Sequence, residues 1–265
     1  MFLDIILPLI ILGALGILFG CLLGYASKKF AVEKDPLFVK IRGDLPGANC
    51  GACGYTGCDA YAEAVASGQA KPNRCCVGGQ ETADEIAKHM GVQAGTVERL
   101  ISRVSCRGNC EAAPDRAEYY GIADCQEASV VAGGGAKACR YGCLGLGSCV
   151  KACQYGAIRV RDGVAETDPE KCTGCGACAR ACPRHLIHLI PEKEFIHLKC
   201  SNPERGRDVK QVCSTGCIGC GLCAKACPQQ AITMENNLPV INREICLGCN
   251  VCVEKCPSGI LQNLR

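Results

Sequence analysis

Cysteine runs with one repeated spacing dominate the second half of this 265-residue sequence. Three runs have the spacing C-x2-C-x2-C-x3-C-P, and they begin at Cys172, Cys217 and Cys246. In such a run three thiolates reach three irons of one cubane, and the fourth cysteine, next to proline, ligates the neighbouring cluster. A disulfide framework does not require this arrangement. The runs therefore predict iron–sulfur clusters.

The runs belong to a longer internal repeat. Eight cysteines return after 74 residues, with Cys139, Cys143, Cys149, Cys153, Cys172, Cys175, Cys178 and Cys182 matching Cys213, Cys217, Cys223, Cys227, Cys246, Cys249, Cys252 and Cys256. Each copy also carries a predicted hairpin, over residues 157–164 with an Asp-Gly turn and over residues 231–241. We therefore expect an α+β fold with two tandem two-cluster ferredoxin-like modules, residues 139–190 and 213–265.

Because the fourth cysteine of each run ligates the neighbouring cluster, the predicted ligands divide into sets that combine two runs. In the second module the sets are Cys217, Cys220, Cys223 and Cys256, and Cys227, Cys246, Cys249 and Cys252. In the first module one set is Cys153, Cys172, Cys175 and Cys178.

The remaining site of the first module lacks one ligand, because Leu146 stands at the position that matches Cys220. Cys139 lies four residues before Cys143 and is the predicted replacement. The fourth set is then Cys139, Cys143, Cys149 and Cys182. A three-iron cluster or an empty site is the alternative.

A separate cysteine pattern lies near the N-terminus. Cys50, Cys53, Cys58 and Cys75 have the spacing C-x2-C-x4-C-x16-C. Residues 58–66 and 81–90 have helical patterns, so residues 28–92 are predicted to form a small, mostly helical domain around one 4Fe-4S cluster. Zinc is the alternative on ligand count, although this is not the usual spacing of paired zinc knuckles.

Two segments are predicted to be connectors, residues 93–138 and 191–212. Five cysteines in or beside them are outside the sets above: Cys106, Cys110, Cys125, Cys200 and Cys213. Five 4Fe-4S clusters are predicted, and these cysteines would permit a sixth, for example Cys106, Cys110 and Cys125 with a distant partner. The alternative is that they are unpaired structural cysteines.

The N-terminal residues 1–27 are predicted to be a single transmembrane anchor. Ile5 to Tyr25 is an uncharged stretch of 21 residues, enough for the roughly 20 that cross a bilayer. The start is not basic, as a signal peptide would require. Lys28 and Lys29 follow the span, so the positive-inside rule places the C-terminal domains in the cytoplasm, at the inner face of the cell membrane.

Several function classes find no support in the sequence. Net charge is only +3, and no basic run is interleaved with aromatic residues, so nucleic acid is not an expected partner. A Rossmann G-x-G-x-x-G context is missing, and so is any acid–base or nucleophilic constellation. No catalytic residues are expected in this chain.

The order of an apolar anchor, a C-x2-C-x4-C-x16-C domain and ferredoxin modules resembles the B subunit of the Rnf complex, a membrane-bound ferredoxin:NAD+ oxidoreductase that pumps ions. The most specific part is residues 47–58, GANCGACGYTGC. The resemblance implies a subunit that accepts electrons from soluble ferredoxin and relays them to other Rnf membrane and flavin-bearing subunits. Leu146 and the connector cysteines depart from the pattern.

Three other interpretations remain open at this point. The chain could be the electron-transfer subunit of another membrane enzyme, such as a hydrogenase or a transcription-factor-reducing complex. It could be a zinc-binding interaction protein without electron transfer. A secreted disulfide scaffold is the third, and the lysines after the anchor argue against it.

Overall fold

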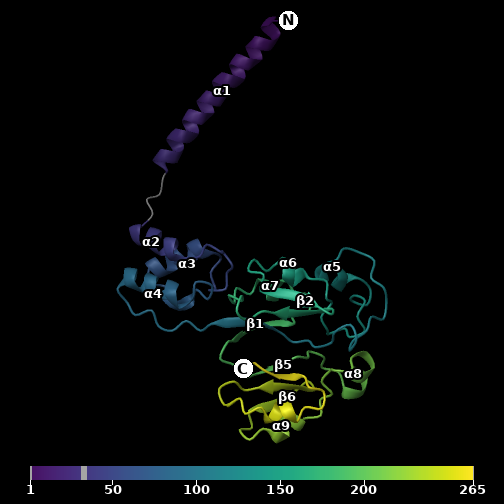
Figure 1. Cartoon of the computed structure of the whole chain (residues 1–265). Helices are drawn as coiled ribbons and strands as arrows, with labels where there is room; N and C mark the ends of the chain where they lie inside the picture. The colour runs from purple at the N-terminus through teal and green to yellow at the C-terminus, as the bar shows by residue number, and fades with distance from the viewer. Residues whose placement is uncertain (1, 31–34, 265) are drawn as a thin grey trace.

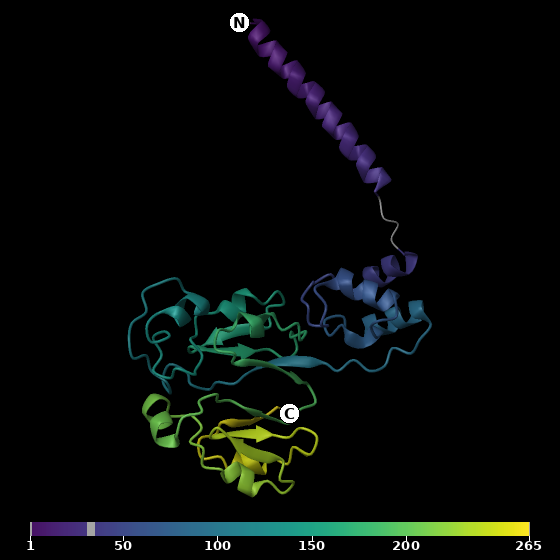
Figure 2. The ribbon, with the colours of Figure 1, turned by 180° about the vertical axis from the view of Figure 1, so that it is seen from behind.

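The computed structural model describes residues 2–30 and 35–264. Figures 1 and 2 show a long helix that stands apart from the rest, then a small helical unit, then two mixed α/β repeats. In both views the first repeat lies beside the helical unit, and the second repeat lies against the first. The fold is therefore mixed, with the cysteine-rich repeats at the far end from the long helix.

The long helix is α1 (Phe2–Lys29), and it contains the predicted apolar span. Ile10–Lys29 has a mean hydropathy of 2.1, and none of this stretch is buried against the rest of the protein. Large apolar side chains such as Leu12 and Ile17 stay about two-thirds exposed. By length and composition the helix can cross a membrane, which would shield this apolar surface from water.

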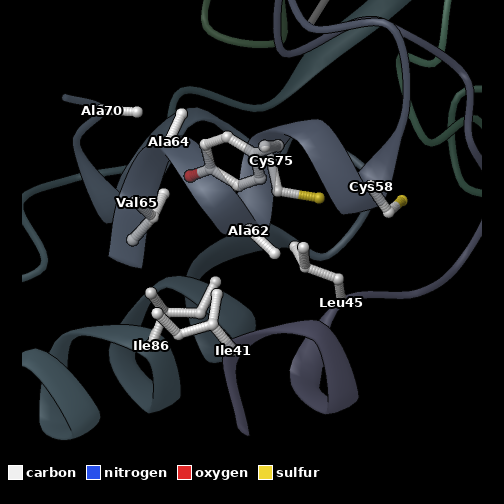
Figure 3. Close-up of a cluster of buried hydrophobic side chains, with 10 residues drawn as sticks. Ile41, Leu45, Cys58, Ala62, Ala64, Val65, Ala70, Cys75 and Ile86 are labelled. Carbon is white, nitrogen blue, oxygen red and sulfur yellow. The ribbon is translucent and has the colours of Figure 1, made fainter. Parts of the chain in front are cut away.

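The helical unit contains α2 (Pro36–Asp44), α3 (Cys58–Ala66), the 3-10 turn η1 (Pro72–Arg74) and α4 (Gly79–Met90). The two predicted helices are confirmed as α3 and α4, and α4 begins two residues earlier than predicted. Ile41, Tyr61, Val65 and Ile86 are at most 1% exposed and form its core. Figure 3 shows Cys58 and Cys75 among these apolar side chains.

The two repeats are built from matching elements. The first contains β1 (Leu100–Val104), α5 (Cys125–Val130), α6 (Ser148–Lys151), β2 (Ile158–Arg161), β3 (Val164–Thr167), α7 (Ala177–Ala181) and β4 (Ile187–Pro191). The second contains β5 (Ile196–Leu198), α8 (Gly206–Val212), α9 (Leu222–Ala226), β6 (Ile232–Glu235), β7 (Leu238–Ile241), α10 (Val251–Glu254) and β8 (Leu261–Asn263). Each repeat has a hairpin, β2–β3 or β6–β7, and two short helices that contact each other.

Both predicted hairpins are confirmed, and their turns explain their register. Asp162 and Gly163 have φ of 48° and 76°, and Asn236 and Asn237 have φ of 47° and 61°. Two successive positive φ values are those of a type I′ turn, whose twist matches that of paired strands. Asp, Asn and Gly are the residues that adopt this conformation at least cost.

The segments predicted to be connectors contribute strands to the repeats. β1 pairs antiparallel with β4, from Leu100 opposite Pro191 to Val104 opposite Ile187. β5 pairs in the same way with β8. The last strand of each repeat must satisfy its backbone groups, and the segment before the repeat supplies the partner strand. Residues 93–138 and 191–212 are thus structural parts of the repeats.

Candidate iron–sulfur sites

The cysteines of the helical unit come together as the sequence predicts. The amide of Cys58, at the start of α3, donates to Asn49 Oδ1 at 2.9 Å, which holds the preceding loop against the helix. The amide of Gly78 donates to Cys75 Sγ at 3.3 Å. Burial raises the pKa of Cys75, the Gly78 amide opposes this rise, and three neighbouring sulfurs add to it, those of Cys58, Cys53 and Cys50. The structure therefore gathers all four predicted thiols.

The second repeat contains two cavities, each lined by one predicted set. The first has about 320 Å³ of space and is lined by Cys217, Cys220, Cys223 and Cys256. The second has about 350 Å³ and is lined by Cys227, Cys246, Cys249 and Cys252. The amide of Ala231 donates to Cys227 Sγ at 3.3 Å. The crossing of Cys227 and Cys256 between the runs agrees with the predicted ligand division.

The four cysteines of the regular site of the first repeat also lie near one another. Burial raises the pKa of Cys178, a hydrogen bond from Ser102 lowers it, and the sulfurs of its three predicted partners raise it, those of Cys172, Cys175 and Cys153. The amide of Ser102, in β1, also donates to Cys172 Sγ at 3.4 Å. The amide of Ala157 donates to Cys153 Sγ at 3.3 Å, as that of Ala231 does to Cys227.

At the irregular site, the cysteine beside Cys143, Cys149 and Cys182 is Cys125, not the predicted Cys139. A cavity with about 350 Å³ of space is lined by Cys125, Cys143, Cys149 and Cys182. Cys125 is the first residue of α5, and its amide donates to Ser148 Oγ at 2.6 Å. Ser148 in turn donates to Asp124 Oδ2 at 2.9 Å. The connector helix α5 thus presents a thiol to the site that Leu146 leaves one ligand short.

Cys139, which the sequence predicted for that site, lines another cavity. Its neighbours there are Cys106, Cys200 and Cys213, and this cavity lies between the two repeats. The geometry therefore does not support Cys139 as a partner of Cys143, Cys149 and Cys182. No motif marks Cys125; the only local signal is Asp124, whose side chain accepts from the Gln126 amide and caps α5.

The suggested grouping of Cys106, Cys110 and Cys125 is also not formed. Cys106 and Cys125 line different cavities. Cys110 is exposed at the surface of the first repeat. Cys76 lies between the helical unit and the first repeat, where its Sγ is 3.6 Å from the carbonyl oxygen of Gly174.

The arrangement of these thiols fits a cubane better than a single metal ion. Among the described residues, no three Cys, His, Asp or Glu side chains are placed to hold one ion. The cysteines instead surround cavities from several sides. A tetrahedral zinc ion needs its sulfurs about 2.3 Å away, whereas a cubane carries its irons out to more widely separated thiolates.

Burial keeps several of these thiols protonated when no cation is nearby. It raises the pKa of Cys149 to about 12 and those of Cys217 and Cys252 to about 11. Since thiolates are the form that binds iron, loading these sites must release protons. Iron binding and the deprotonation of these thiols are therefore coupled.

Three family descriptions match the sequence where the cysteines gather. Residues 45–77 match a family described as an Fe-S cluster domain. Residues 165–188 match a 4Fe-4S binding domain, and residues 216–260 match a 4Fe-4S dicluster domain. The matches cover the helical unit and parts of both repeats.

Relatives match over most of the chain. The B subunit of the Na(+)-translocating ferredoxin:NAD(+) oxidoreductase complex of Acetobacterium woodii is 47% identical over 239 residues, which are 90% of this chain and 72% of the relative. Its counterpart in the proton-translocating complex of Clostridium ljungdahlii is 42% identical over 91% of this chain and 86% of that protein. The B subunit of an ion-translocating oxidoreductase complex from Methanosarcina acetivorans is 39% identical over 88% and 89%.

Proposed function

This chain belongs to the family of B subunits of the ion-translocating ferredoxin:NAD+ oxidoreductases, or Rnf complexes, and we propose that it passes electrons from reduced ferredoxin to the membrane subunits. Its iron–sulfur domains make it an electron-transfer subunit of an oxidoreductase and translocase. The chemistry that bound clusters supply is one-electron transfer at low potential.

Five ligand sets support this role. They are Cys50, Cys53, Cys58 and Cys75; Cys125, Cys143, Cys149 and Cys182; Cys153, Cys172, Cys175 and Cys178; Cys217, Cys220, Cys223 and Cys256; and Cys227, Cys246, Cys249 and Cys252. In this proposal the helical unit from α2 to α4 binds one cluster, and each repeat is a two-cluster module. Backbone amides that donate to the sulfurs orient these ligands and tune the potentials.

A contact between the helical unit and the first repeat supports an order in which electrons pass through the chain. Arg180, in α7, donates to the carbonyl oxygen of Cys50 at 2.9 Å. The two sites thus lie close together, since α7 also carries Cys178. The helical unit follows α1 directly, so electrons leave the chain there, next to the membrane partners. Ferredoxin delivers them to the repeats.

The observation that carries this proposal is the gathering of four thiols at each of five sites in a chain of this family. In this proposal α1 attaches the chain to the membrane and the repeats lie in the cytoplasm, which Lys28 and Lys29 in the last turn of α1 support through the positive-inside rule. A reducing cytoplasm keeps the thiols free for iron. Other Rnf membrane and flavin-bearing subunits are the expected partners.

The test uses the full-length protein in detergent, purified without air. Iron and acid-labile sulfide are measured, and reduced ferredoxin is then added while EPR spectra are recorded. We expect iron and sulfide in equal amounts and cluster signals that grow as ferredoxin is oxidised. A protein without acid-labile sulfide, or clusters that ferredoxin cannot reduce, would overturn the proposal.

A matched pair of variants tests the exit site within the assembled complex. Cys53→Ala removes a ligand of the helical unit, and Cys110→Ala removes an exposed thiol as the control. We expect Cys53→Ala to be reduced by ferredoxin as before but to stop NAD+ reduction by the complex. Normal NAD+ reduction by Cys53→Ala would mean that electrons leave the chain elsewhere.

A further inference from the structure

A cavity between the two repeats is lined by four cysteines that no sequence motif connects. Cys106 lies two residues after β1, and Cys200 lies two residues after β5. Cys139 and Cys213 are partners in the 74-residue repeat. Each repeat therefore contributes one cysteine after its outer strand and one before its first cluster loop. The four positions follow the internal symmetry of the molecule.

The four thiols are buried and close together. They are between 5% and 9% exposed. A Cβ atom added to Gly108 would lie 3.3 Å from Cys213 Sγ and 3.8 Å from Cys106 Sγ, so these two sulfurs flank one glycine. Burial raises the pKa of Cys139, and the sulfurs of Cys213 and Cys200 add to this rise. The cavity is lined by four cysteines, like the cavities of the 4Fe-4S runs in the second repeat.

Each of the four sulfurs has a polar neighbour. The amide of Cys143 donates to Cys106 Sγ, and the amide of Cys217 donates to Cys200 Sγ, both at 3.3 Å. Asn202 Nδ2 lies 3.8 Å from Cys139 Sγ, and Thr215 Oγ1 lies 3.6 Å from Cys213 Sγ. Cluster thiolates accept such hydrogen bonds, and the same bonds tune the reduction potential.

The surroundings of the cavity are cationic. Lys137 is only 4% exposed, and its ammonium donates to the carbonyl oxygens of Gly108 at 2.7 Å and Gly163 at 3.0 Å. Lys199 also lines the cavity, and Arg184 donates to the carbonyl oxygen of Cys139 at 2.9 Å. Buried cations are costly unless an anion is near. A cubane with four thiolates has a charge of roughly −2 and would supply that anion.

The segments around the cavity are tied across the interface between the repeats. Ser201 Oγ donates to the carbonyl oxygen of Ser105 at 2.9 Å. The amide of Ser214 donates to the carbonyl oxygen of Ala112 at 2.8 Å. These bonds tie the two halves of the four-cysteine set to each other across the interface.

We propose that Cys106, Cys139, Cys200 and Cys213 bind a sixth 4Fe-4S cluster, which joins the two repeats electronically. On one side Cys143 belongs to the irregular site and donates to Cys106 Sγ; on the other Cys217 belongs to the second repeat and donates to Cys200 Sγ. A single hydrogen bond therefore leads from the new site to a ligand of each neighbouring site. A cluster held there would accept one electron from one neighbouring site and donate one to the other, with no proton or bond transferred.

The proposed ligand set is inferred from the cavity and its surroundings alone. The role of the sixth cluster as a link between the repeats rests on the proposed function. Native mass spectrometry and iron analysis of the air-free full chain test the ligand set. We expect six clusters, about 24 irons per chain, and about 20 in Cys200→Ala and in Cys139→Ala. Cys110→Ala is the control and should keep all six. A native chain with only five clusters, or Cys200→Ala with all six, overturns the proposal, and the native count decides even if a variant fails to fold.

The role as a link is tested in Cys200→Ala by rapid freezing and EPR after ferredoxin is added. We expect the five remaining clusters to be present but those of one repeat to be reduced at least tenfold more slowly than in the native chain. Equal rates would overturn the linking role. Failure of the proposed function would look different, because ferredoxin would then reduce no cluster in the native chain either.

Discussion

The two repeats solve the same binding problem with different ligands. In the second, Cys220 lies in the short loop of a C-x2-C-x2-C run and is exposed. In the first, Leu146 takes that position, and the buried Cys125 comes from helix α5, outside the 74-residue unit. Both sites are cavities lined by four cysteines, three of which occupy matching positions in the repeat. The cavity is therefore a property of the shared backbone, and its fourth thiol can come from either place.

Backbone angles show that the loop around Leu146 and the loop around Cys220 have the same shape. Gly145 and Gly147 flank Leu146 with φ of 73° and 81°, and Gly219 and Gly221 flank Cys220 with φ of 66° and 68°. Glycine adopts this left-handed conformation with the least strain, and both loops keep glycine at both positions, so the loop shape is preserved although the ligand is lost. A ligand can move to another segment because the loop does not depend on it for its shape.

The largest expected effect comes from removing the substituted ligand. Cys125→Ala should lose about four irons per chain, as Cys220→Ala should in the second repeat, because each variant leaves a cubane with three thiolates. Iron and sulfide analysis of the air-free proteins measures this. Cys110→Ala is the control. A full iron complement in Cys125→Ala would mean that a residue other than Cys125 is the fourth ligand of the irregular site.

Restoring the motif should reverse that loss. The double variant Cys125→Ala with Leu146→Cys should regain about four irons, because residue 146 has the loop frame of Cys220. EPR of the reduced protein should show the recovered cluster. If the double variant stays short of iron, the two loops are not equivalent and the two repeats do not share one frame.

Much of this fold could be predicted from the sequence, because the relevant signals are local. The runs around Cys172, Cys217 and Cys246 encode their own loops, and the Asp162-Gly163 turn encodes its hairpin. Cys125 could not be predicted in this way, since it reaches its site only when the connector folds back and Ser148 accepts its amide hydrogen bond. Likewise Cys106 and Cys200 depend on the pairing of β1 and β5 with strands at the ends of the repeats. Those contacts are long-range, so they produce no pattern of cysteine spacing in the sequence.

A matched pair of glycine variants tests how tightly each loop packs on its hairpin. A Cβ on Gly145 would lie 2.7 Å from the carbonyl oxygen of Gly163, a distance at which the backbone must move, whereas one on Gly219 would lie 3.1 Å from Asn237 Cβ and 3.2 Å from its carbonyl oxygen. Both variants to alanine carry the left-handed cost of roughly 1 to 2 kcal/mol. Gly145→Ala adds about 1 to 3 kcal/mol, because it must displace backbone. Thermal unfolding of the loaded chain should show the larger loss of stability for Gly145→Ala. Equal losses would mean that the first hairpin yields as easily as the second.

The smallest effect concerns the residue that holds the substituted ligand. Ser148 is buried and accepts the amide hydrogen bond of Cys125, while its counterpart in the repeat, Leu222, is exposed. Ser148→Ala leaves that buried amide without its partner, at a cost of about 1 to 3 kcal/mol. Leu222→Ala should cost less than about 0.5 kcal/mol. Iron release to a chelator should therefore be faster from Ser148→Ala than from the native chain, and unchanged in Leu222→Ala. Unchanged iron release from Ser148→Ala would mean that the bond to iron alone holds Cys125. Ser148 would then have no role in the ligand difference between the two repeats.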